Sequence, residues 1–97
     1  MEFDGFDWDS GNRGKCQKHG VPTEDIEALF AGQPRVGPDI RHSVAEQRFR
    51  AVGMTADGRH LFVVFTFRAA GRRRLIRPIS ARYMHEREAA AYEKDIP

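Results

Sequence analysis

The residues of this chain best suited to chemistry are arginines gathered in the short segment 68–82. Six arginines fall within these fifteen positions, and no carboxylate lies between Asp57 and Glu86 to neutralise them. A guanidinium group keeps its charge and can bind a phosphate through two parallel hydrogen bonds. The segment therefore indicates an anion-binding surface, and we interpret the anion as the phosphate backbone of RNA. Taken alone, the segment would fit a solvated strand or hairpin equally well.

Two further groups of residues could contribute to such a surface. Glu46, Arg48 and Arg50 alternate along a stretch that reads as a strand, so their side chains would share one face. Either an anion site or a solvated face fits this pattern. Lys18 and His19 end the first expected helix, where a cation also favours the helix dipole. A structural role for these two residues is therefore supported as well as a catalytic one.

Metal and cofactor chemistry is disfavoured by the spacing of potential ligands. The four histidines are scattered, the chain has one cysteine, and no paired-carboxylate or phosphate-loop motif occurs. Cys16 lies within the first expected helix without an evident base beside it, and a small buried apolar residue explains it. We therefore expect no metal and no cofactor. RNA supplies its own nucleophile, the 2′-hydroxyl, so cleavage needs only a base, an acid and cations around the phosphate.

Length and composition place the chain among small intracellular domains. Its 97 residues fit a single domain, expected to span 1–97. One cysteine cannot form an internal disulfide, which favours a reducing compartment. The N-terminus is acidic rather than signal-like, and no apolar run approaches the roughly 20 residues of a membrane span. We therefore expect a cytoplasmic protein with no membrane partner.

Periodicity and turn residues predict an α+β domain: an N-terminal strand, two short helices, an antiparallel β-meander and a C-terminal helix. The expected strands are 2–8, 34–40, 46–55, 60–68 and 73–80, and the expected helices are 10–19, 24–31 and 84–95. Strand 60–68 is apolar on both faces, so it should lie at the centre of the sheet.

The ends of the first two helices carry residue signals. Asp9 or Ser10 can cap the first helix, and Gly20 would end it. Thr23 can cap the second helix, and Gly32 would end it.

The last strand and the closing helix have less regular patterns. Pro78 has no N–H to donate to a neighbouring strand, so its strand should lie at a sheet edge or end there. The inward side of the closing helix should carry Met84, Ala89 or Ala90, and Tyr92.

The first hairpin loop decides which charged residues meet. If the loop has three residues, 56–58, with its glycine left-handed, then Arg48 lies opposite Thr66 and Glu46 lies opposite Arg68, all on one face. A two-residue loop would send the two arginines to opposite faces and separate the candidate site. We favour the three-residue loop.

Several blocks of this sequence resemble the BrnT family of bacterial type II toxins. The blocks are F-D-W-D at 6–9, Asn12, K-C-Q-K-H-G-V at 15–21, E-x-R at 46–48, and R-P-I-S-A-R-Y-M at 77–84 followed by Glu88 and Tyr92. The resemblance implies a RelE-like ribonuclease fold and an RNA cleavage activity that blocks translation. It also implies a small neutralising antitoxin, BrnA, with a ribbon-helix-helix part, and a toxin–antitoxin complex that represses its own operon.

The resemblance matches Lys18, His19, Glu46, Arg48, Arg68, Arg77, Ser80, Arg82 and Tyr92 to family positions, and the charge pattern of the chain adds Arg50 and Arg74. The candidate catalytic residues are Lys18, His19, Glu46, Arg48, Arg77 and Arg82, and the candidate RNA-contacting residues are Arg50, Arg68, Arg74, Ser80 and Tyr92. Glu46 or His19 would act as base or acid, with Lys18 assisting, while arginines hold the phosphate. Pro78 departs from the family pattern by replacing an aliphatic residue.

Two other functions use the same arginines. A non-catalytic module could bind nucleic acid or an acidic partner, and the basic face could serve mainly as the interface for an antitoxin. Operator DNA is expected as a partner only through the antitoxin.

Overall fold

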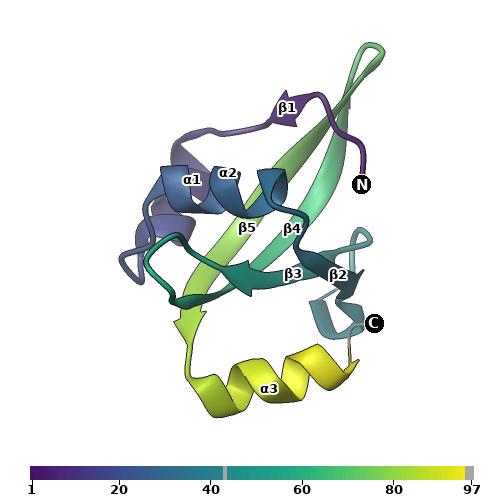
Figure 1. Ribbon diagram of the computed structural model, residues 1–97. Coiled ribbons are helices and arrows are strands. Elements are labelled where there is room, and N and C mark those ends of the chain that lie inside the picture. The colour runs from purple at the N-terminus through teal and green to yellow at the C-terminus, as the bar shows by residue number, and fades with distance from the viewer. Residues whose placement is uncertain (43, 96–97) are drawn as a thin grey trace.

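The computed structural model describes residues 1–42 and 44–95 (Figure 1). The described chain forms a five-stranded sheet in the order β1-β5-β4-β3-β2, together with three α-helices. The elements are β1 (Gly5–Phe6), α1 (Ser10–Gln17), α2 (Thr23–Ala31), β2 (Arg35–Pro38), a 3-10 turn (Ile40–His42), β3 (Phe49–Met54), β4 (His60–Ala70), β5 (Arg73–Met84) and α3 (Glu86–Asp95). The α+β class is confirmed.

The sheet is mixed because the N-terminal strand joins it in parallel. β2, β3, β4 and β5 form the expected antiparallel meander, with β4 at the centre. β1 pairs with β5 in parallel and is much shorter than the expected strand 2–8. Its flanking residues still follow β5, because the backbone N–H groups of Asp4 and Asp7 donate to the carbonyls of Arg74 and Ile76.

The register of the first hairpin is the expected one. Arg50 lies opposite Val64 and Met54 opposite His60, so the loop between the strands holds residues 56–58. Gly58 has φ +84°, the left-handed conformation that glycine adopts without strain. Extended to the residues that precede β3, this register places residue 46 beside residue 68.

The helix ends agree with the sequence signals at Asp9 and Gly32 and differ at two places. α1 ends at Gln17 with Lys18 as its C-cap, so it is shorter than the expected 10–19, and Gly20 lies in the turn that follows, where its N–H donates to the carbonyl of Gln17. Asp9 caps α1 through a reciprocal hydrogen-bond pair with Asn12, and Gly32 ends α2. The expected cap at Thr23 is wrong, because Pro22 occupies that position and no side chain caps the helix. The carbonyl of Pro22 already accepts from Asp25, so Thr23 lies inside the first turn.

The expectation for Pro78 is correct in part. β5 lies between β4 and β1 and continues six residues beyond Pro78 to Met84, so the strand does not end there and is not an edge strand along its whole length. β1 pairs only with Leu75 and Ile76, so β5 is the edge of the sheet at Pro78 itself. A β-bulge accommodates the proline: Val64 pairs with Ser80 while Phe65 pairs with Pro78, which leaves Ile79 as an extra residue. β1 has already ended at this level, so the missing N–H faces no strand.

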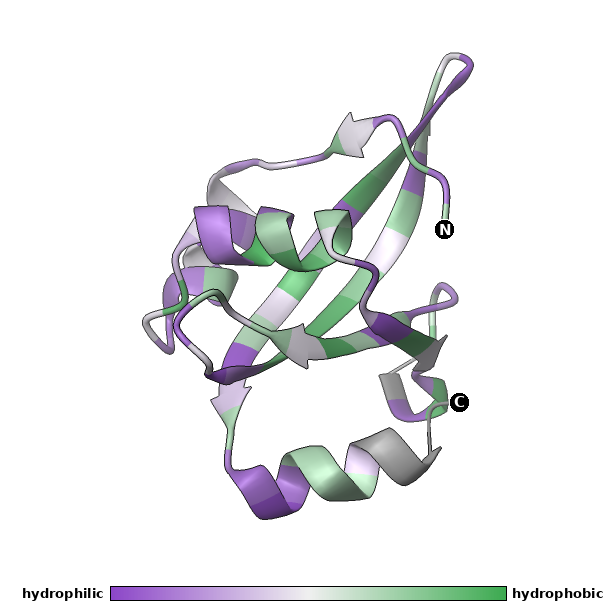
Figure 2. Cartoon of the chain, in the orientation of Figure 1, coloured by the Kyte–Doolittle hydropathy of each residue, from purple (hydrophilic) through white to green (hydrophobic). Residues whose placement is uncertain are grey.

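Apolar side chains pack on both faces of the sheet, and Figure 2 marks apolar residues along the chain in green. On one face, α1 and α2 bury Cys16, Ile26 and Phe30 against a cluster that includes Phe65 and Ile76. On the other face, Ala89 of α3 packs with four sheet residues: Val52, Phe62, Val64 and Met84. Of the positions expected to face inward from the closing helix, Ala89 is buried and Ala90 is exposed, while Met84 belongs to β5.

Cys16 behaves as the buried apolar residue that its context indicates. It is fully buried, and burial raises the pKa of its thiol to about 11. Within the described residues, no helix has the length and apolar character needed to cross a membrane.

Asn12 fastens α1 to the sheet. Its side-chain amide is 3% exposed and donates to the carbonyl of Pro78 at 2.8 Å and to that of Asp7 at 2.9 Å. Its side-chain oxygen accepts from the Asp9 N–H at 2.8 Å. One buried amide thus joins three segments, and it does so at the bulge of β5.

Replacing Asn12 by Ala should therefore destabilise the fold. The change leaves two carbonyls without a donor and removes half of the capping box, so we expect the free energy of unfolding to fall by roughly 2 to 4 kcal/mol. Urea denaturation measures this loss. The control is Gln17→Ala, because Gln17 is exposed at the other end of α1, and its expected effect is under about 0.5 kcal/mol. Equal effects of the two changes would contradict this role of Asn12.

Candidate active site

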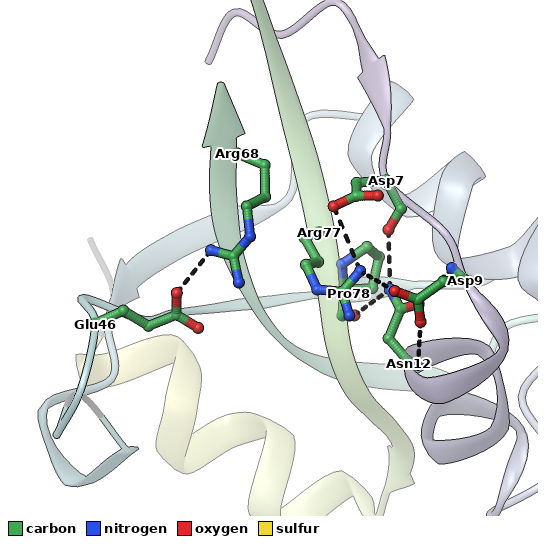
Figure 3. Close-up of polar contacts among 7 residues, drawn as sticks. All are labelled: Asp7, Asp9, Asn12, Glu46, Arg68, Arg77 and Pro78. Carbon is green, nitrogen blue, oxygen red and sulfur yellow. Dashed lines mark hydrogen bonds and ion pairs between the residues drawn. The ribbon is translucent and has the colours of Figure 1, made fainter. Parts of the chain in front are cut away.

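An ion pair between β4 and the segment before β3 forms the first part of the candidate site. Arg68 Nη1 lies 2.6 Å from Glu46 Oε2 (Figure 3). Arg48 Nε lies 3.7 Å from Glu46 Oε1. Thr66 Oγ1 donates to the backbone carbonyl of Gln47 at 2.8 Å, which holds the segment before β3 against β4. The hairpin register therefore brings Glu46 to Arg68, as the three-residue loop predicts.

A second ion-paired group fixes Arg77 on β5. Its Nη1 lies 2.9 Å from Asp9 Oδ2 and 3.3 Å from Asp7 Oδ2, and its side chain is only 18% exposed. Asp9 also caps α1, so the helix start and the arginine share one carboxylate. Figure 3 shows this group beside α1, with the Glu46–Arg68 pair next to β4.

The first group and Arg77 of the second line a common pocket of about 230 Å³. Its lining residues are Gly11, Asn12, Lys15, Glu46, Arg48, Arg68, Arg77 and Ile79. Four cations and one carboxylate thus meet in one small space, and they come from α1, the segment before β3, β4 and β5. A larger hollow of about 360 Å³ lies between α2 and β3, with Arg35 and His60 among its lining residues. We place the candidate site in the smaller pocket because the cations converge there.

The bulge in β5 decides which face its arginines occupy. Arg77 pairs with Thr66 and Arg82 with Phe62, and both partners point to the same face of β4. Residues five apart in a regular strand would lie on opposite faces, so the extra residue Ile79 brings Arg77 and Arg82 to the same side.

Four other candidate residues gather near α3 rather than in the pocket. Arg82 forms an ion pair with Glu88 at 2.6 Å, and its guanidinium lies 4.8 Å from the centre of the Phe62 ring. The guanidinium of Arg50 stacks over Tyr92 at 5.0 Å. Ser80 pairs with Val64 on the same face of the sheet. These residues extend the basic face along α3.

Three candidates lie away from the pocket. Lys18 and His19 are exposed after the end of α1. Arg74 stacks on Phe67 and donates to the carbonyl of Glu2, close to the tip of the β4–β5 hairpin. The arginine-rich segment therefore divides into residues of the pocket, of the α3 face and of the hairpin tip.

Sequence reasoning missed three residues that the structure brings to the site: Asp7, Asp9 and Lys15. The two aspartates carry no sequence signal that identifies Arg77 as their partner, because the contact spans about seventy residues. Lys15 did carry a signal, because it lies three positions before the candidate Lys18 in the expected helix 10–19 and so would share its helix face.

The arginines set the protonation of the carboxylates. Hydrogen bonding to Arg68, and then the charges of Arg68 and Arg48, lower the pKa of Glu46 below its usual 4.5. The hydrogen bond from Arg77 likewise lowers the pKa of Asp9. At neutral pH Glu46 is therefore ionised.

The comparison with protein families identifies the chain. A family model described as the ribonuclease toxin BrnT of type II toxin–antitoxin systems matches residues 8–88. The chain belongs to the BrnT family. A search of curated proteins found no match. The matched range contains every residue that lines the pocket.

Membership of the BrnT family sets the broad function. The protein is a ribonuclease toxin of a type II toxin–antitoxin system, so RNA is its substrate and an antitoxin is its partner. This agrees with the interpretation of the arginines as ligands for an RNA backbone.

The ion pairs of this region make stability depend on acid pH. A carboxylate whose pKa is lowered in the folded chain stabilises it above the unfolded value, 3.8 for Asp and 4.5 for Glu, and this contribution is lost as the pH falls through the folded value. Urea denaturation should therefore give a lower free energy of unfolding at pH 3 than at pH 6.

The variant Glu46→Gln provides the matched comparison for this effect. Its amide cannot titrate, so the loss of stability between pH 6 and pH 3 should be smaller than for the unmodified chain. An identical loss in both proteins would show that the Glu46–Arg68 pair contributes nothing to the pH dependence.

Proposed function

We propose that this protein is a metal-independent endoribonuclease that cleaves RNA by attack of a 2′-hydroxyl on the adjacent phosphate. The observation that carries the proposal is the convergence of Arg48, Arg68 and Arg77 with Glu46 in one pocket. Cations around the phosphate stabilise the charge that develops on its oxygens, and a carboxylate nearby can remove the proton of the nucleophile.

The arginines would hold the scissile phosphate. The ion pairs of Arg68 and Arg77 engage Nη1 of each side chain. A guanidinium has five N–H donors, so the same side chain can be held by a carboxylate and still donate to a phosphate. In this arrangement the carboxylates orient the forks before RNA arrives, which lowers the cost of ordering them on binding.

Glu46 would act as the general base. Its ionised carboxylate takes the proton of the 2′-hydroxyl while the 2′-oxygen forms a bond to phosphorus. The bond from phosphorus to the 5′-oxygen breaks, and the products are a 2′,3′-cyclic phosphate and a 5′-hydroxyl. We assign this step to Glu46 rather than His19 because Glu46 lines the pocket and His19 does not.

The residues near α3 would contact the RNA on one side of the cleaved linkage. Arg50, Arg82 and Ser80 lie on the same sheet face as the pocket, and Tyr92 offers an aromatic ring for a base to stack on. These contacts would position the strand and leave the phosphate chemistry to the pocket.

The biological setting follows the family. We propose that the partner is a BrnA-like antitoxin with a ribbon-helix-helix part, that the complex represses its own operon, and that the toxin acts on RNA in the cytoplasm. A short ribbon-helix-helix reading frame beside the gene would support this assignment.

Incubation of the purified protein with labelled RNA tests the activity. We expect fragments that end in a 2′,3′-cyclic phosphate or 3′-phosphate. Binding of RNA without any fragments would instead identify a non-catalytic binding module.

Removal of a phosphate-holding arginine should slow cleavage. Arg48→Ala and Arg68→Ala should each lower the rate by about 10²- to 10³-fold, because each donor stabilises the developing negative charge. Both should relieve growth arrest when expressed in cells. The control is Arg13→Ala, an exposed cation of α1 that stacks on Trp8 outside the pocket, and it should cleave at the normal rate. Normal rates for both pocket variants would exclude this pocket as the site.

Chelation should leave the reaction unchanged. Because the proposed chemistry uses only side chains and the 2′-hydroxyl of RNA, addition of EDTA should not alter the initial rate. Loss of activity that a divalent cation restores would contradict metal independence.

A further inference from the structure

The proposed cleavage requires a general acid, which Glu46 and the arginines of the pocket do not supply. When the bond from phosphorus to the 5′-oxygen breaks, the leaving alkoxide needs a proton. Arginine cannot provide it, because a guanidinium stays protonated in proteins. Glu46 is ionised at neutral pH and serves as the base.

The lining of the pocket leaves one candidate for this acid. Apart from the arginines, its residues are Gly11, Asn12, Lys15, Glu46 and Ile79. Glycine and isoleucine have no side chain that exchanges protons, and the amide of Asn12 is buried in hydrogen bonds to Asp7, Asp9 and Pro78. Among these lining residues, only Glu46 and Lys15 can exchange a proton under ordinary conditions.

The charge balance of the pocket also points to Lys15. Arg68 and Arg77 each have a carboxylate partner within 3 Å. Lys15 is exposed on the last turn of α1 and has no ion-pair partner in the part of the chain that the structure describes. An uncompensated ammonium group at the wall of a cationic pocket is suited to contact a phosphate oxygen.

The position of Lys15 suits the geometry of the reaction. Figure 3 shows α1 beside β5 and Glu46 on the other side, beyond β4. Lys15 belongs to α1 and lines the pocket together with Glu46, so the two residues come from elements on opposite sides of it. In an in-line displacement the nucleophile and the leaving group lie on opposite sides of phosphorus. A base and an acid on opposite walls match this requirement.

We propose that Lys15 is the general acid of the reaction. Its ammonium group donates a proton to the 5′-oxygen as the bond to phosphorus breaks, while Glu46 takes the proton of the 2′-hydroxyl. The step leaves a protonated Glu46 and a neutral Lys15, and exchange with water restores both. This inference rests on the proposed ribonuclease function.

Substrates with two different leaving groups test the assignment. One is a short RNA that the unmodified protein cleaves, and the other carries sulfur in place of the 5′-oxygen at the same linkage. A thiolate leaves without a proton, so loss of the acid should matter only for the oxygen substrate. We expect the Lys15→Ala variant to cleave the oxygen substrate about 10²- to 10⁴-fold more slowly than the unmodified protein. It should cleave the sulfur substrate at nearly the normal rate.

Three further variants complete the experiment. Lys15→Arg keeps the charge without a transferable proton, so it should show the same difference between the two substrates. Arg13→Ala, an exposed cation on the same helix, should match the unmodified protein on both substrates. Lys18→Ala tests the lysine that directly follows α1, and a leaving-group effect in this variant instead of in Lys15→Ala would overturn the proposal.

The outcomes separate this inference from the function on which it rests. If the unmodified protein cleaves neither substrate, the ribonuclease proposal itself fails. If the unmodified protein cleaves RNA and the Lys15→Ala variant cleaves both substrates at the normal rate, Lys15 is not the acid. The same conclusion follows if the variant cleaves both substrates equally slowly while its thermal unfolding is unchanged. Only a loss confined to the oxygen substrate supports it.

Discussion

One extra residue in β5 places the arginines of this protein on a single face of the sheet. The bulge at Ile79 changes the side on which the following residues point, so that Arg77 and Arg82 share a face with Arg68 of β4. Pro78 suits this place because it has no N–H to leave without a partner, and its carbonyl accepts from the buried amide of Asn12. The same few residues therefore set the direction of the arginines and fasten α1 beside them.

The carboxylates of the chain prepare this face for an anion. Asp7 and Asp9 hold Arg77, Glu46 holds Arg68, and Glu88 holds Arg82. Each pair offsets part of the repulsion between neighbouring cations and orders a long side chain before RNA binds. Glu46 differs from the others because it lines the pocket, where a carboxylate can also take part in proton transfer.

Local sequence patterns predicted the parts of the site that local geometry controls. The three-residue loop with Gly58 gave the register that joins Glu46 to Arg68, and Asp9 was identified as a helix cap. Local patterns do not predict long-range contacts, and nothing in the sequence pairs Arg77 with Asp7. The effect of Pro78 on the sheet depends on where β1 ends, which is also a long-range property. Lys15 and Lys18 both stand in the block 15–21, and the resemblance gives a role only to Lys18 with His19, whereas Lys15 is the one that lines the pocket.

The central claim is that a scissile phosphate sits where arginines of separate strands converge. A structure of the protein with RNA that carries a 2′-O-methyl group at the cleaved position tests it directly, because this group prevents attack and keeps the linkage intact. We predict that the phosphate lies within hydrogen-bond distance of Arg48, Arg68 and Arg77, between Glu46 and Lys15. A phosphate held instead at the hairpin tip by Arg72 to Arg74, with the pocket left empty, would contradict the account.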